Sequence, residues 1–156
     1  MPLSLRSLCL LCLLSIVGLS HGLCHELTEL NRVDVAPITK WFHIASVTLT
    51  PNSFIRTTNA FTADYKAEII PFSFYDEVGT LRISIVDSDL KKLLNNESIS
   101  FKGAATNSEK KIHLITGEVI PKTISNGTLK VKLYYNSLIT LSFVTSYSLP
   151  LLKSEK

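Results

Sequence analysis

The chain has 156 residues, of which 46% are hydrophobic, and its 16 basic and 13 acidic side chains give a net charge of +3. This length suits one domain with a buried core of its own. The basic residues mostly stand singly, with acidic residues between them. That arrangement excludes the basic stripe of a nucleic-acid-binding protein, so we expect no nucleic acid among its partners.

Residues 1–22 have the pattern of a secretory signal peptide. Arg6 gives a basic start, an apolar run follows, and the small residues Ser20 and Gly22 come after it. The apolar run is too short for a transmembrane helix, which needs about 20 such residues. We therefore expect cleavage after Gly22 or after Ser20, a secreted or periplasmic location, and no stable membrane span in the mature protein.

The cysteines divide between the signal peptide and the mature chain. Cys9 and Cys12 lie in the signal peptide, so Cys24 is the only cysteine that remains after cleavage. One thiol forms no intrachain disulfide, and the domain must be stabilised by packing. Two interpretations of Cys24 stay open: an unpaired residue near the N-terminus, or a disulfide that joins two copies into a dimer.

From Trp41 onward, apolar and polar residues alternate with a period of two, which is typical of strands with one buried face and one exposed face. The predicted strands cover residues 41–50, 61–69, 80–85, 98–103, 112–120, 128–135 and 138–147. The alternation is less clean in 41–50, 112–120 and 138–147, and the last of these is predicted from its β-branched and aromatic residues. In the first of them, Trp41 and His43 fall on the face expected to point inward. In the fifth, Gly117 is a candidate for a β-bulge.

One helix is predicted, from Ser88 to Asn95, and it covers one end of the sheet. Its leucines are three and four residues apart, and Asp87 or Ser88 is placed to cap its first amides. Turns are predicted at 51–53, 76–79 and 106–109, at Pro71, and at the hairpin-forming pair Asn126-Gly127.

These elements predict an all-β fold of about seven to eight antiparallel strands with one short helix. The pattern fits a single antiparallel barrel and also fits a sandwich. The expected organisation is a signal peptide at 1–22, the β domain at 23–150 and a disordered tail at 151–156.

The sequence contains no catalytic or metal-binding motif that we recognise. No HxH, HExxH, GxSxG or GxxxxGK pattern is present. His43 is interpreted as a core histidine and His113 as a residue at the edge of a strand. We therefore predict a protein that is not an enzyme and has no metal or cofactor.

Two Asn-X-Ser/Thr sequons, at Asn96 and Asn126, fall in predicted turns. They are interpreted first as turn formers. In a host that glycosylates its secreted proteins they would also be accessible acceptors.

Aromatic residues are the remaining candidates for function. Three of them fall within residues 72–75, which is more than one strand face requires. Two interpretations are open: an aromatic core, or the lining of a cavity for an apolar ligand. The predicted ligand-binding residues are Trp41, His43, Phe61, Tyr65, Phe72, Phe74, Phe101 and Phe143.

Residues 99–103 (ISFKG) and 115–122 (ITGEVIPK) resemble the second half of the YceI-like family, which consists of secreted, lipocalin-like bacterial barrels. The resemblance implies a barrel and a lipid-like ligand. Our leading hypothesis is a secreted, non-enzymatic barrel that binds an apolar or lipid-like molecule. The alternative is a β-sandwich that serves as a structural or protein-interaction module of the cell envelope.

Overall fold

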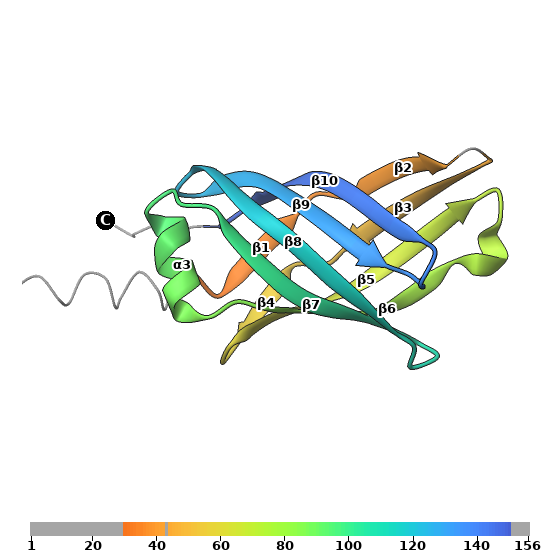
Figure 1. The fold of residues 1–156 in the computed structure, drawn as a ribbon, viewed down its shortest axis with the longest axis horizontal. Helices are drawn as coiled ribbons and strands as arrows, with labels where there is room; N and C mark the ends of the chain where they lie inside the picture. Colours follow the sequence, from red (N-terminus) through yellow and green to blue (C-terminus); the bar gives the residue numbers. More distant parts are fainter. Residues whose placement is uncertain (1–29, 43, 151–156) are drawn as a thin grey trace, which may run out of the picture.

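Within residues 30–42 and 44–150, which the computed structural model describes, the chain forms ten β-strands, a 3-10 helix and one α-helix (Figure 1). In chain order these are β1 (Arg32–Val35), β2 (Ile38–Phe42), β3 (Ala45–Pro51), β4 (Phe54–Thr57), β5 (Ala60–Ile70), η1 (Ser73–Tyr75), β6 (Glu77–Ser84), α3 (Asp87–Leu94), β7 (Ile99–Asn107), β8 (Ile112–Thr123), β9 (Asn126–Tyr134) and β10 (Thr140–Ser148).

Eight of these strands close into an antiparallel barrel. The ring runs β4-β1-β10-β9-β8-β7-β6-β5, and it closes where β5 pairs with both β6 and β4. The β2–β3 hairpin extends the wall beyond the ring, with β3 paired to the second half of β5. The predicted all-β fold with one short helix is confirmed, and the structure decides for a barrel over a sandwich.

Prolines and a bulge divide the first part of the wall. β1 pairs with β4 and β2 pairs with β3, and both pairs have the same register: Arg32 lies opposite Ile55, and Ile38 lies opposite Leu49. The breaks between β1 and β2 and between β3 and β4 therefore do not shift this pairing. The pairing of β3 and β4 with β5, by contrast, shifts by one residue between the two strands. After β3 the Asn52 amide donates to the Asp64 carbonyl oxygen, but in β4 Ile55 lies opposite Thr62, one residue away from that register. The extra residue is a β-bulge, which bends this wall.

The prediction of one strand over 41–50 is wrong, because a hairpin turn separates Phe42 from Ala45. These two residues are paired, so even-numbered residues of β2 lie beside odd-numbered residues of β3. Trp41 therefore faces outward and is 75% exposed. The prediction of an inward Trp41 assumed that Trp41 continued the alternation of β3, and the turn interrupts that alternation.

The inward side chains of β5 to β10 are the odd-numbered ones, and they make the core with residues of β4 and α3. All four glycines of residues 30–42 and 44–150 lie on this inward face. An aromatic ring from the next strand lies against three of them: Tyr65 against Gly79, Phe101 against Gly117 and Tyr147 against Gly127. These rings thus occupy the space that a side chain at the glycine would need.

Gly117 is not a bulge, in contrast to the prediction. It pairs regularly with Phe101 on one side and Val131 on the other, and the irregularity of β8 lies at Pro121–Thr123. The hairpin predicted from Asn126-Gly127 does form, but its turn is Ile124-Ser125 and the pair begins β9. In both cases the glycine provides space for a neighbouring aromatic ring.

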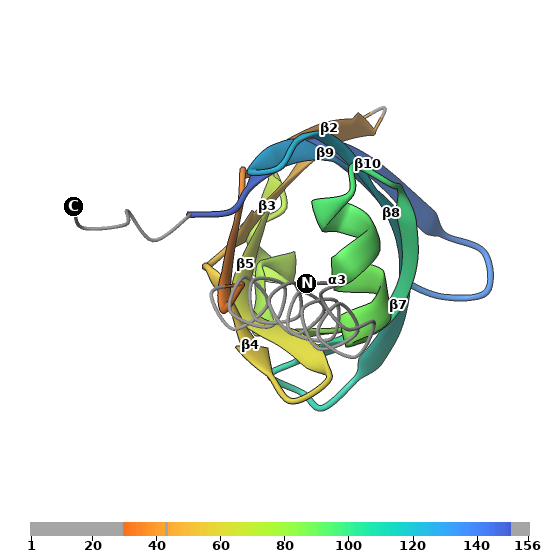
Figure 2. The ribbon, with the colours of Figure 1, turned by 90° about the vertical axis from the view of Figure 1, so that its left-hand side faces the viewer.

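Helix α3 lies across one end of the barrel (Figure 2) and buries Leu90 and Leu93 against the core, as predicted. It ends before Asn95, and Asn96 adopts a left-handed φ of 58°. The predicted cap is wrong: Val86 is the N-cap residue and no side chain bonds to the first amides. The Asp87 carboxylate instead contacts the Arg56 guanidinium of β4 at 2.5 Å, which ties the helix to the wall.

Several predictions concern residues outside the described ranges: the signal peptide, the cleavage site, Cys24, His43 and the tail. Within residues 30–42 and 44–150, no helix is long and apolar enough to cross a membrane.

Replacement of Gly117 by alanine tests the close packing of the barrel wall. The new Cβ would collide with the Phe101 ring and the Lys130 carbonyl oxygen. We expect the free energy of unfolding to fall by about 1 to 3 kcal/mol, measured by denaturant titration. Ser100→Ala, on the exposed face of β7, is the control and should change it by less than about 0.5 kcal/mol. Equal stability of the two variants would contradict this packing.

Candidate functional site

The barrel encloses a cavity of about 420 Å³, which is the candidate functional site. Inward-facing side chains from the ring strands, from β2 and β3 and from α3 line it. Its volume lies within the range of about 300 to 1,000 Å³ that is usual for small-molecule pockets. The barrel interior therefore has room for a ligand.

The lining is almost entirely apolar. Among the described lining residues, the side chains are hydrocarbon except for Glu77, His113 and the four tyrosines Tyr65, Tyr75, Tyr135 and Tyr147. No lysine or arginine of the described chain is among them. Such a surface favours an apolar molecule, because burying hydrocarbon stabilises a complex by roughly 25 cal/mol per Å².

The cavity is closed at one end and open at the other. At the α3 end, which we call the closed end, the lining residues Leu30, Phe54 and Leu90 are buried. At the opposite end the lining residues Tyr75 and Ile139 are 62% and 47% exposed. The loops of β5–β6, β7–β8 and β9–β10 surround this open end, away from α3 (Figure 1).

A hydrogen-bonded polar cluster lies toward the open end. The Tyr65 hydroxyl donates to Oε1 of Glu77, and Nδ2 of Asn107 donates to Oε2 of the same carboxylate at 3.0 Å. Oδ1 of Asn107 accepts from the Lys111 amide at 2.9 Å. Burial, followed by the bond to Glu77, raises the pKa of Tyr65. The cluster connects β5, β6 and β7 and holds the carboxylate in place.

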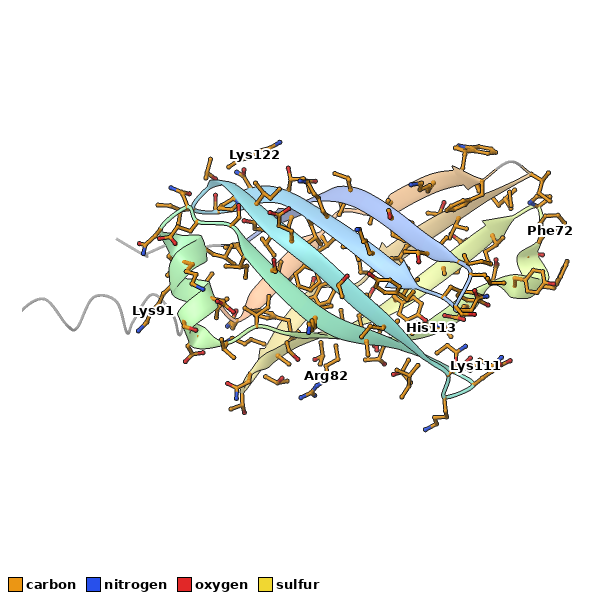
Figure 3. The ribbon with its side chains drawn as sticks, in the orientation of Figure 1. Phe72, Arg82, Lys91, Lys111, His113 and Lys122 are labelled. Atoms are coloured by element: carbon orange, nitrogen blue, oxygen red, sulfur yellow. The ribbon has the colours of Figure 1, made fainter. Side chains whose placement is uncertain are left out.

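His113 is the second polar feature near the open end (Figure 3). Its side chain is inward and only 8% exposed, and its ring stacks on Tyr135 with 4.8 Å between centroids. Nδ1 lies 2.9 Å from the Tyr135 carbonyl oxygen, while Nε2 is buried without a hydrogen-bond partner. One ring nitrogen is thus fixed by the backbone, and the other is buried without a partner among the described residues.

Four of the residues predicted to bind a ligand line the cavity. They come from three different parts of the ring: Phe61, Tyr65, Phe101 and Phe143. Phe61, Tyr65 and Phe101 lie on strands whose clean alternation predicted their direction. Phe143, by contrast, lies on a strand with apolar residues on both faces.

Three predicted residues lie outside the cavity. Trp41 faces outward on β2, Phe74 is 75% exposed in η1, and Phe72 lies just before η1, with its ring centroid 6.0 Å from that of Phe74. β5 ends at Ile70, so the period of two no longer directs the side chains that follow. Tyr75 alone of the aromatics in this segment lines the cavity. His43 is outside the described residues.

The interpretation of His113 as an edge residue is wrong, since it lies inside the barrel. β8 misled the prediction because its outward face carries Ile112 and Leu114, which are 71% and 53% exposed. The useful signal was that His113 falls on the same strand face as Ile115, Gly117 and Val119, which are two core residues and a glycine. The aliphatic lining residues were also not singled out from the sequence.

Within the part of the chain that the structure describes, no three His, Cys, Asp or Glu side chains come together in a way that would hold a metal ion. The fold and the site define a class: a closed eight-stranded antiparallel barrel with an apolar internal cavity. Comparisons of the chain with models of known protein families, with curated proteins and with solved structures found no match. The resemblance to the YceI-like family stays a prediction.

The raised pKa of Tyr65 predicts a pH dependence of stability. The unfolded chain loses its tyrosine protons near pH 10, whereas folded Tyr65 keeps its proton above that value. The stabilising effect is therefore complete below about pH 10 and is lost as the pH rises further. Tyr65→Phe should make this alkaline loss shallower, as measured by urea unfolding at stepped pH.

Tyr134→Phe is the matched control, because this tyrosine lies on the outward face of β9. It should keep the alkaline slope of the original protein. Identical slopes for Tyr65→Phe and Tyr134→Phe would argue against a raised pKa of Tyr65 in the folded protein.

Proposed function

We propose that this protein is a secreted, non-enzymatic barrel that binds an apolar or lipid-like molecule in its interior. The observation that carries the proposal is the cavity of about 420 Å³ with its nearly continuous hydrocarbon lining. A solid β-barrel would fill this space with side chains. The proposal of secretion rests on the signal-peptide pattern of residues 1–22.

The packing of the wall supports the same function. Inward glycines let the rings of Tyr65, Phe101 and Tyr147 lie against neighbouring strands. Large side chains therefore cover the wall and leave the centre of the barrel open. At the open end, the exposed lining residues Tyr75 and Ile139 offer an apolar ligand a first apolar contact.

A second candidate function is an interaction module of the cell envelope. The observation that favours it is a set of exposed apolar side chains on the loops and hairpins near the open end: Trp41, Ile44, Phe74 and Leu138. Exposed apolar surface of this kind is typical of contact sites. We rank this candidate below ligand binding because it does not use the cavity.

The direct test is to identify what the purified protein carries. Native mass spectrometry should show a bound species in addition to the protein, and organic extraction should release a lipid-like molecule. Delipidated protein should then take up a hydrophobic fluorescent dye, and the extracted molecule should displace the dye. Protein without any bound apolar molecule and without dye uptake would refute lipid binding and leave the interaction module.

Filling the cavity should block binding without disturbing the outer surface. Val131 is a half-buried lining residue of β9, so Val131→Trp places a large ring in the interior. We expect the affinity for the dye to fall by about tenfold or more, which corresponds to about 1.4 kcal/mol.

Lys132→Trp places the same ring on the exposed face of the same strand and is the control. It should bind the dye as the original protein does, and circular dichroism should show both variants folded. Equal affinity of both variants would mean that the dye binds outside the barrel.

A further inference from the structure

His113 differs from the other buried polar side chains of the described chain because one of its nitrogens lacks a hydrogen-bond partner. Over residues 30–42 and 44–150, its Nε2 is the one buried side-chain nitrogen or oxygen that has no hydrogen-bond partner. Leaving such an atom unpaired is unfavourable, because it gives up its hydrogen bond to water and gains none inside the protein. His113 also lines the cavity, and Nε2 itself has almost no accessible surface, so a ligand in the cavity must move the covering side chains aside to pair with it.

The other ring nitrogen determines what Nε2 can bind. Nδ1 lies 2.9 Å from the backbone carbonyl of Tyr135, and a carbonyl oxygen only accepts. Nδ1 must therefore carry the hydrogen, and in the neutral ring Nε2 presents a lone pair. Nε2 is an acceptor, so its partner must be a hydrogen-bond donor.

The nearby polar side chains do not supply this donor. The Tyr65 hydroxyl hydrogen and one of the two Nδ2 hydrogens of Asn107 are directed to Glu77, and no side chain of the described residues makes a hydrogen bond to Nε2. Glu77 also places a carboxylate in the lining, and no lysine or arginine among the described lining residues balances it. Lys111, whose charge reaches Glu77, lies outside the lining and is paired with Glu109 at 2.6 Å. A ligand with an anionic head would therefore meet a like charge with no cation in the described lining, which is unfavourable in a largely apolar site.

We propose that the ligand is an uncharged amphiphile whose hydroxyl head donates a hydrogen bond to Nε2 of His113, with its hydrocarbon tail pointing toward α3. This assignment rests on the proposed function and specifies its ligand class. It places the head near the open end, beside the polar cluster, and the tail among Leu90, Leu93 and Phe101, which are buried deeper in the barrel. Long-chain alcohols and monoacylglycerols have this chemistry.

The test compares four probes that share one chain length: dodecanol, its methyl ether, dodecane and dodecanoate. Each competes with a hydrophobic dye for the delipidated protein at one fixed, mildly alkaline pH. The alcohol should bind about tenfold more tightly than the ether, because only the alcohol donates a hydrogen bond. It should also bind more tightly than the anionic dodecanoate.

The outcomes separate this inference from the function on which it rests. If none of the four probes displaces the dye, lipid binding itself fails. If all four bind, but the alcohol and the ether bind equally or dodecanoate binds most tightly, lipid binding stands and the assignment of the head group is overturned.

Two further measurements place the contact at His113. In His113→Phe the alcohol should lose its advantage over the ether, whereas Ile112→Phe, an outward substitution on the same strand, should keep it. In the unsubstituted protein, nitrogen NMR of the imidazole should show Nδ1 protonated and Nε2 unprotonated. The alcohol should shift the Nε2 signal and the ether should not; equal shifts from both would overturn the proposal.

Discussion

The pairing of β5 with β6 is the constraint on which the rest of the structure depends. It closes a sheet that would otherwise have two free edges, and every ring strand then has one face toward an enclosed interior. Because the sheet is closed, alternate residues of each strand point into the barrel and the residues between them point outward. The chemistry of the interior is therefore set by alternate residues of the strands, and here those residues are mainly aliphatic and aromatic.

Much of this fold follows from the sequence because alternation is a local signal. Residues 61–69 and 80–85 alternate without exception, and there both the strands and the inward residues, such as Phe61 and Tyr65, were predicted correctly. The leucines of α3 were equally clear. The choice between barrel and sandwich was not available from the sequence, because it depends on which distant strands pair, above all β1 with β10.

The failures have a common physical cause: a residue's direction depends on its partner strand as well as on its neighbours in sequence. Across the turn between Phe42 and Ala45, the inward residues change from even-numbered to odd-numbered ones, so Trp41 points outward. On β8, exposed Ile112 and Leu114 concealed the inward position of His113. Gly117 looked like a bulge because a glycine in a strand has several uses, and only the Phe101 ring of the paired strand shows which one applies.

The pairing of β1 with β10 also gives the molecule a direction. Residues 30 and 150, the ends of the described chain, both lie at the closed end, beside α3 and the β8–β9 turn (Figures 1 and 2). Any tether attached at either point leaves the barrel from the side opposite the entrance. Immobilised through such a tether, the protein would present its open end to the surrounding solution, so the entrance to the cavity would stay accessible.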